Sequence, residues 1–309
     1  MKKLLLIPAI LCSIVANELL AQQQATFTQY MFNGLAINPA YAGSHDLLDI
    51  SALGRWQWAG VEGAPTTQTL AMHTGIPGKN IGLGLQITND QIAVTDQTSV
   101  MLAYSYSIPL GNGALRMGAQ GGFQSFRSDL LDVYTLGAGI DQSFSQNVSA
   151  SRPNFGLGFY YSNSKWYGGL SSPILLNNTL QNGDDVIITQ SRHYFLTGGY
   201  LFDLSPDVKV KPSFLVKAVS GAPVSVDYNV NVLLKELLWV GVSVRPPESI
   251  NFLVEFNINS NFRVGYAYDY IIDDNLSNIT TSSHELLINY RFQLFKNKGA
   301  EEVAVNTYF

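Results

Sequence analysis

Apolar and polar residues alternate over short segments along most of this chain. Between residues 250 and 259, for example, Phe252 and Val254 alternate with Asn251 and Glu255. Because successive side chains of a β-strand point to opposite faces, this pattern predicts strands with one apolar and one polar face. We predict strands at residues 48–59, 66–75, 80–89, 98–108, 114–126, 152–162, 165–171, 190–203, 208–219, 224–233, 236–245, 250–259, 262–270 and 284–294.

The number and the length of these segments favour a transmembrane β-barrel. They are even in number, and most come near the roughly 9 to 11 residues that a tilted strand needs to cross a bilayer. No stretch after residue 21 approaches the roughly 20 apolar residues of a spanning helix. We therefore expect an all-β fold, a transmembrane antiparallel up-and-down barrel of about 14 strands, because one soluble sandwich usually holds fewer strands.

The connections between the predicted strands differ in length at the two ends of this barrel. After even-numbered strands they are tight and rich in turn residues, as at residues 77–79, 111–113 and 259–261. After odd-numbered strands they are mostly longer, above all at residues 127–151, 172–189 and 271–283. Outer-membrane barrels have short periplasmic turns and long external loops. We therefore expect both termini to be periplasmic.

Residues 1–21 have the pattern of a cleavable signal peptide, in which Lys2 and Lys3 precede an apolar run that ends near Ala21. The single cysteine, Cys12, lies in this segment, so the exported chain has no disulfide, which suits a bacterial cell envelope. Charged residues make up only 13% of the chain, and the net charge is −5. The absence of a Lys/Arg cluster excludes nucleic acid as a partner.

Residues 22–47 are apolar and aromatic but show no strand pattern. They include Phe27, Tyr30, Phe32 and Tyr41, which would form an exposed hydrophobic patch if nothing covered them. The segment could fold into the lumen as a plug, because a barrel of this size is wider than its own side chains can fill. It could instead dock on a periplasmic partner. We favour the plug, followed by the barrel at residues 48–295 and a periplasmic tail at residues 296–309.

The charged residues predicted to face the lumen are of mixed sign. They are Arg55, Arg116, Asp227, Arg245, Glu255, Arg263, Asp269, Glu285 and Arg291. A selective porin often shows a bias toward one sign, whereas mixed charges suit internal ion pairing around a plug. This composition weakens the interpretation of the barrel as an open channel.

The four tryptophans, Trp56, Trp58, Trp166 and Trp239, lie close to predicted strand ends. Amphipathic rings favour the lipid headgroup region, so these positions suit a membrane barrel. The alternative is that they are buried core aromatics of a soluble sandwich.

Residues for catalysis, metal binding or cofactor binding are scarce. The histidines, at positions 45, 73, 193 and 284, show no metal-ligand spacing, so we expect no metal site and no cofactor. The glycine-rich stretch at residues 118–122 is not followed by a helix, so it indicates bends or close approaches in a strand rather than a nucleotide loop.

One grouping could suggest an outer-membrane hydrolase. His284 follows Ser282 and Ser283 and lies near Asp273 and Asp274. Nearness in sequence does not establish the geometry of a catalytic triad. We therefore expect this protein not to be an enzyme.

The run from Gln29 to Gly43, QYMFNGLAINPAYAG, resembles the N-terminal signature of the PorP/SprF family, outer-membrane proteins of the type IX secretion system of Bacteroidetes. The similarity continues at Arg55-Trp56, at residues 80–85 and at residues 284–292. Within the run, we take nine positions as candidates for plugging or partner binding: Gln29, Tyr30, Phe32, Asn33, Asn38, Pro39, Ala40, Tyr41 and Gly43.

The resemblance implies a plugged barrel that supports the secretion or surface attachment of a client protein, such as an adhesin used in gliding motility. It also implies binding of the client's C-terminal signal domain and of periplasmic ring components of the secretion machinery, with outer-membrane lipid around the barrel. The alternative function is a plugged channel for small hydrophobic solutes, similar to fatty-acid transporters. The tail after residue 296 departs from the family pattern, since family members often end at the last strand.

Overall fold

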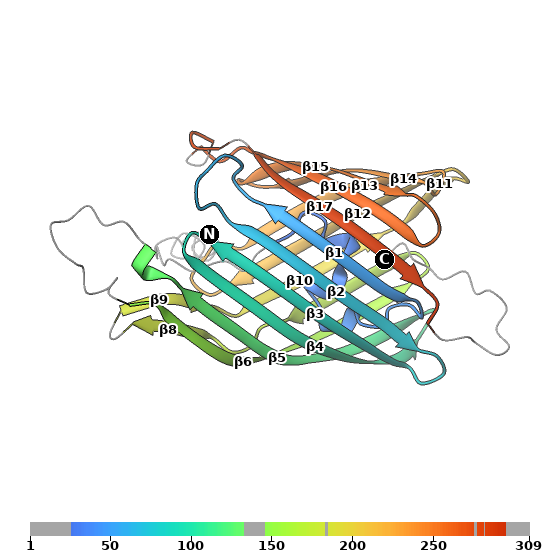
Figure 1. The fold of residues 1–309 in the computed structure, drawn as a ribbon. Coiled ribbons are helices and arrows are strands. Elements are labelled where there is room, and N and C mark those ends of the chain that lie inside the picture. Colours follow the sequence, from blue (N-terminus) through green and yellow to red (C-terminus); the bar gives the residue numbers. More distant parts are fainter. Residues whose placement is uncertain (1–25, 133–145, 183–184, 275–276, 281, 295–309) are drawn as a thin grey trace, which may run out of the picture.

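The computed structural model describes residues 26–132, 146–182, 185–274, 277–280 and 282–294. Its strands curl into one antiparallel barrel, which Figure 1 shows from the side. The strands are β1 (Leu48–Trp56), β2 (Thr66–Ile76), β3 (Ile81–Ile92), β4 (Thr95–Leu110), β5 (Gly113–Ser128), β6 (Val148–Asn163), β7 (Trp166–Ser172), β8 (Asn178–Asn182), β9 (Asp185–Gln190), β10 (His193–Tyr200), β11 (Phe202–Ser205), β12 (Val208–Val219), β13 (Ser225–Leu234), β14 (Leu238–Arg245), β15 (Ser249–Asn257), β16 (Phe262–Ile271) and β17 (Ser282–Phe292).

The barrel is closed because every strand of its wall pairs with two neighbours. β1 pairs with β2 and also with β17, the last strand, and β10 pairs with β7 and with β12. β10 and β11 are separated only by Leu201 and occupy one position in the wall, whereas β8 and β9 form a separate hairpin. The predicted fourteen-stranded barrel is therefore confirmed.

The wall carries its apolar residues on the outside. In β15, Phe252 and Val254 are 51% and 40% exposed, whereas Asn251 and Glu255 are fully buried. This arrangement is the reverse of a soluble protein and is the one that lipid requires. Among the described residues, no helix is long and apolar enough to cross a membrane.

The tight connections lie at one end of the barrel. Strand β1 begins and strand β17 ends at this same end, where Leu48 pairs with Phe292. The long connections lie at the opposite end, although the connections β3–β4 and β14–β15 are also short there. The predicted connection at residues 172–189 contains the β8–β9 hairpin, which the sequence pattern did not predict. The predicted signal peptide and the tail from residue 296 lie outside the described residues.

The tryptophans divide between the two faces of the wall. Trp56 and Trp166 are 45% and 43% exposed on the outside. Trp239 is buried and contacts the ring of Phe32 inside the barrel, so its predicted place among lipid headgroups is wrong. The reason is alternation: Val240 takes the outward face of β14, so its neighbour Trp239 faces inward.

We expect the substitution Val254→Arg to destabilise the barrel by about 2–4 kcal/mol, because it places a charge near the middle of a lipid-facing strand. Val224→Arg is the matched control, since Val224 lies between β12 and β13 and is 61% exposed. Unfolding by denaturant in lipid vesicles, followed by tryptophan fluorescence, measures both. Equal losses in the two variants would contradict the outward orientation of Val254.

Candidate functional site inside the barrel

The described part of the N-terminal segment, residues 26–47, lies inside the barrel (dark blue in Figure 1). Three short 3-10 helices shape it: η1 (Tyr30–Phe32), η2 (Gly34–Ala36) and η3 (Pro39–Tyr41); a fourth, η4 (Leu130–Asp132), follows β5. Asn38 caps η3, because its Oδ1 accepts a hydrogen bond from the Ala40 N–H at 2.9 Å, and Pro39 occupies the first helical position. Asn38 and Pro39 of the signature thus have a local structural role.

A buried group of charges holds the start of the segment. The backbone N–H groups of Thr28 and Gln29 donate to the two carboxylate oxygens of Glu285 at 2.6 and 3.0 Å. The hydroxyl of Thr28 donates to Asp269 at 2.7 Å. Arg55 forms ion pairs with both Asp269 and Glu285. The guanidinium of Arg55 thus pairs with both carboxylates, and the backbone of the segment donates two further hydrogen bonds to Glu285.

The next residues contact strands β12, β13 and β14. The hydroxyl of Tyr30 accepts a hydrogen bond from Asn229 at 2.6 Å, and burial raises the pKa of Tyr30 well above its ordinary value, so it stays neutral. The ring of Phe32 lies 5.9 Å from that of Trp239, between centroids. The ammonium of Lys211 lies 5.0 Å from the Phe32 ring and 4.8 Å from the Trp239 ring, within the range of cation–π attraction.

Backbone carbonyls hold the end of the segment. Ser171 donates to the carbonyl of Ile37, and Ser105 donates to that of Ala42, each at 2.6 Å. Asn38 donates in the other direction, from its Nδ2 to the carbonyl of Phe159 on β6 at 2.9 Å. The ring of Tyr41 packs edge-on against Tyr160. The segment is thus bonded to strands all round the wall.

Glycines let the backbone of the segment lie directly against the wall. A Cβ atom added to Gly118 on β5 would lie 2.3 Å from the nitrogen of Ala40, closer than any real contact. Gly43 adopts a positive φ of 66°, which glycine tolerates without strain. The prediction that the glycine-rich stretch from residue 118 marks a close approach is therefore confirmed at Gly118.

The nine signature residues all belong to the segment that lies inside the barrel. All except Gly43 are buried. The side-chain amide of Gln29 and the Nδ2 of Asn33 have no hydrogen-bond partner among the described residues. The close contacts thus come from Tyr30, Phe32, Asn38 and Tyr41, together with backbone groups.

The predicted internal ion pairs form. Asp227 receives two hydrogen bonds from Arg245, each at 2.7 Å, and Glu255 pairs with Arg263 at 3.2 Å. Arg291 pairs with Asp49, an acid that the sequence pattern did not single out. Arg116 instead donates to the carbonyl oxygens of residues 43 and 44.

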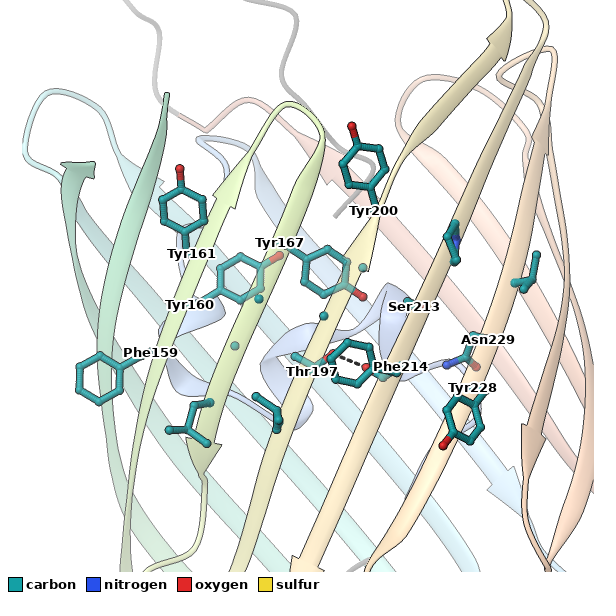
Figure 2. Close-up of a pocket in the computed structure, with 18 of the residues that line it drawn as sticks. Phe159, Tyr160, Tyr161, Tyr167, Thr197, Tyr200, Ser213, Phe214, Tyr228 and Asn229 are labelled. Carbon is teal, nitrogen blue, oxygen red and sulfur yellow. Dashed lines mark hydrogen bonds between the residues drawn. The ribbon is translucent and has the colours of Figure 1, made fainter. Parts of the chain in front are cut away.

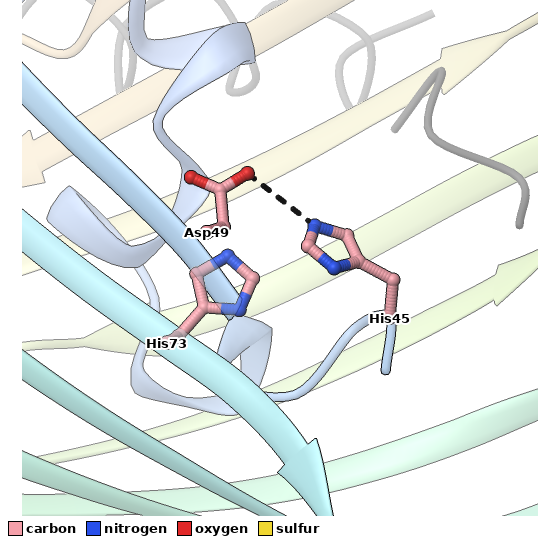
Figure 3. Close-up of side chains that lie close together, drawn as sticks. All are labelled: His45, Asp49 and His73. Atoms are coloured by element: carbon pink, nitrogen blue, oxygen red, sulfur yellow. Dashed lines mark ion pairs between the residues drawn. The ribbon is translucent and has the colours of Figure 1, made fainter. Parts of the chain in front are cut away.

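Three further side chains meet where the segment joins the barrel: His45, Asp49 and His73 (Figure 3). Nε2 of His45 lies 3.5 Å from Oδ2 of Asp49, and the two imidazole rings are 4.8 Å apart, between centroids. Burial lowers the pKa of His45, which keeps its ring neutral. Sequence spacing did not reveal this group, because His73 is brought to Asp49 only by the pairing of β1 with β2.

The structure separates two members of the grouping that could suggest a hydrolase, Ser283 and His284. Ser283 faces inward, where its hydroxyl accepts a hydrogen bond from the Trp58 N–H at 3.1 Å. His284 lies on the other face of β17, with its Nδ1 2.7 Å from the hydroxyl of Tyr266. Neighbours on a strand point to opposite faces, so Ser283 and His284 do not form a catalytic pair.

The outer wall has a hollow of about 920 Å³ over β6, β7, β10, β12 and β13. Gly168 and Gly198 pair across β7 and β10 at its floor and contribute no side chains. Figure 2 shows the surrounding rings, with Phe159 and Tyr228 to either side of the hollow. The hollow is apolar and continuous with the outward face of the barrel.

A closed barrel with an apolar outer face and an ion-paired interior defines an outer-membrane β-barrel protein. Residues 19–290 match the family model described as "Type IX secretion system membrane protein PorP/SprF". The chain therefore belongs to the PorP/SprF family, and the resemblance inferred from the signature is confirmed.

Solved outer-membrane barrels are similar in fold alone. The outer membrane protein Omp33 of Acinetobacter baumannii is 8% identical, with a TM-score of 0.46, and the match covers 81% of this chain and 100% of that one. The CymD monoaromatic hydrocarbon channel is 12% identical, with a TM-score of 0.46, over 85% of this chain and 93% of that one. A Pseudomonas aeruginosa FadL homologue is 8% identical, with a TM-score of 0.45, over 81% of this chain and 89% of that one. No curated protein matches this chain.

We expect Gly118→Ala to displace the segment from the wall, because the added methyl group overlaps the backbone at Ala40. The cost of such overpacking is about 1–3 kcal/mol. Limited proteolysis of the detergent-solubilised barrel should then cut within residues 26–47 faster than in the parent protein. Gly168→Ala is the control, since its new methyl group would have no neighbour closer than 3.8 Å. Equal cleavage of the two variants would show that this contact does not hold the segment.

Proposed function

We propose that this barrel serves the type IX secretion system by binding a secreted client protein and the secretion machinery, with its lumen plugged by residues 22–47. Membership of the PorP/SprF family makes the chain an outer-membrane component of that system. The single observation that carries the finer proposal is the interior of the barrel. There the signature residues are buried and the segment is hydrogen-bonded to the wall, which supports a plugged lumen.

The space left in the lumen supports plugging. Between the segment and strands β3, β4 and β5 there is a cavity of about 90 Å³, lined by residues that include Phe27, Ala36 and Gln120. This cavity is much smaller than the hollow of about 920 Å³ on the outer wall. The carboxylate of Glu285 is engaged by Arg55 and by two backbone N–H groups of the segment, so it is not free to select a passing solute.

Orientation follows from the two ends of the barrel. We propose that the end with the tight turns, where Leu48 pairs with Phe292, faces the periplasm. Both chain termini would then meet the ring components of the secretion machinery. The long connections, including the β8–β9 hairpin, would face the cell surface and the C-terminal signal domain of the client. Outer-membrane lipid would cover the apolar wall, including the hollow over β7 and β10.

We expect solubilisation of the native envelope in gentle detergent, followed by capture of the tagged barrel, to recover ring components or a large adhesin. The control is a second, unrelated barrel of the same membrane carrying the same tag. Mass spectrometry identifies the captured proteins. A barrel recovered alone would contradict the proposal.

The same purified barrel tests the alternative, a channel for small hydrophobic solutes. The filled lumen predicts no swelling of liposomes that contain it and no single-channel conductance. Robust flux through the barrel alone would favour the channel over the interaction protein.

We expect protease added to intact cells to cut between β5 and β6, at residues 129–147, and to spare the turn between β4 and β5 at residues 111–112. The reason is that these two connections lie at opposite ends of the barrel. Mass mapping of the fragments identifies the cut, and lysed cells provide the control in which both ends are accessible. A cut confined to residues 111–112 on intact cells would reverse the proposed orientation.

A further inference from the structure

The junction between the N-terminal segment and the barrel contains buried imidazole nitrogens without hydrogen-bond partners. Nδ1 of His45 and Nδ1 of His73 have no hydrogen-bond partner among the described residues, and Nε2 of His45 lies 3.5 Å from Oδ2 of Asp49. Both side chains are about 5% exposed. Buried polar groups are almost always bonded, and an exception calls for a bound ion or water as its explanation.

One imidazole nitrogen of each histidine and one carboxylate oxygen lie close together. One ligand atom from each of His45, Asp49 and His73 lies within 4.8 Å of the others. Neighbouring ligands of a tetrahedral zinc ion are about 3.4 Å apart, as follows from metal–ligand distances of about 2.0–2.1 Å. The most widely separated of these atoms therefore need to approach by up to about 1.4 Å around an ion, a movement within the reach of small χ changes.

Backbone hydrogen bonds hold the Cα atoms of these three residues close to one another. Asp49 and His73 are directly opposite each other in the β1–β2 ladder. The carbonyl of His45 accepts a hydrogen bond from Gly75 at 3.1 Å, two residues beyond His73 on the same strand. Ligands on such rigid elements are held in place before the ion arrives.

The carboxylate of Asp49 has the outer contacts that metal-binding carboxylates usually have. Its Oδ1 accepts hydrogen bonds from Ser51 at 3.0 Å and from Asn289 at 2.5 Å, and Arg291 donates to its Oδ2. Such contacts orient a ligand and keep it ionised. The guanidinium of Arg291 also opposes a second positive charge nearby, so the affinity should be lower than at a site closed by four protein ligands.

We propose that His45, Asp49 and His73 bind one divalent transition-metal ion of the zinc type, which fastens the N-terminal segment to strands β1 and β2. Two imidazole nitrogens and one carboxylate oxygen suit zinc, and water completes a four-coordinate shell at sites with three protein ligands. The ion would link residue 45, at the end of the segment, to the first two strands of the barrel. This inference does not depend on the identity of the client or on the direction of secretion.

Zinc titration of the full-length barrel tests the proposal. After treatment with a chelator and its removal, the detergent-solubilised protein should bind one Zn²⁺ per chain with a dissociation constant of about 1 μM, measured by competition with a fluorescent zinc indicator. His45→Gln and His73→Gln should each weaken this binding at least tenfold. His193→Gln is the matched control, because His193 is also buried in the barrel but lies far along the chain on β10.

A second readout separates zinc binding at this site from adventitious binding at the surface. Zinc should slow proteolysis within residues 26–47 of the parent protein and of His193→Gln, but not of His45→Gln. Heat-modifiable migration on a gel verifies that each variant is a folded barrel. Binding that is equally strong in all variants, or no binding at 100 μM zinc, would overturn the proposal. Its failure would leave the capture experiment and the proposed function untouched.

Discussion

This structure depends on one constraint: the polar side chains that face the lumen must be paired or hydrogen-bonded. A lipid-facing barrel must place its apolar residues outside, so every strand delivers polar or charged side chains to the lumen. A buried carboxylate is tolerated only when it is paired and hydrogen-bonded. Glu285 meets that requirement through Arg55 and through two N–H groups of the N-terminal segment. The segment thus supplies hydrogen bonds that a buried charge of the barrel wall needs.

The same logic explains why the segment contacts so much of the wall. Its hydrogen bonds reach β17 and β16 near its start, β13 at Tyr30, and β4, β6 and β7 near its end. Apolar contacts between Phe32 and Trp239 lie between these polar ones. Because these partners lie on strands far apart around the circumference, the segment links different sides of the wall through the lumen. The backbone groups that it bonds to the wall, at residues 28, 29, 37 and 42, lie before, between and after its short 3-10 helices.

The fold could be predicted from sequence because lipid imposes a local rule on every strand. The alternation of Asn251 and Phe252 already states which side chain faces lipid, and tight turns mark the strand ends. The burial of the N-terminal segment was also predictable as an alternative, since Tyr30 and Phe32 cannot remain exposed. The sign pattern of the inward charges indicated ion pairing, but it could not assign partners. Arg55 meets Glu285 only because β1 closes the barrel against β17.

The group of His45, Asp49 and His73 shows where sequence reasoning ends. The register that places Asp49 opposite His73 depends on the connection at residues 57–65, which has no simple turn pattern to fix its length in space. The inward orientation of Trp239 was missed for a related reason, because nearness to a strand end does not determine which face of the strand a residue occupies. Local patterns therefore specified the outside of the barrel, while pairing between distant strands determined its inside.

The way the segment is held also limits how it could move during secretion. Withdrawing it would separate Thr28 and Gln29 from Glu285 and leave that carboxylate with Arg55 alone. Each hydrogen bond to a charged group contributes about 1.5–3 kcal/mol, and two of them would be lost. Thermal motion would open such a barrel in fewer than about one molecule in a hundred, since each 1.4 kcal/mol is a factor of ten. Any displacement of the segment would therefore have to offset the loss of its two hydrogen bonds to Glu285.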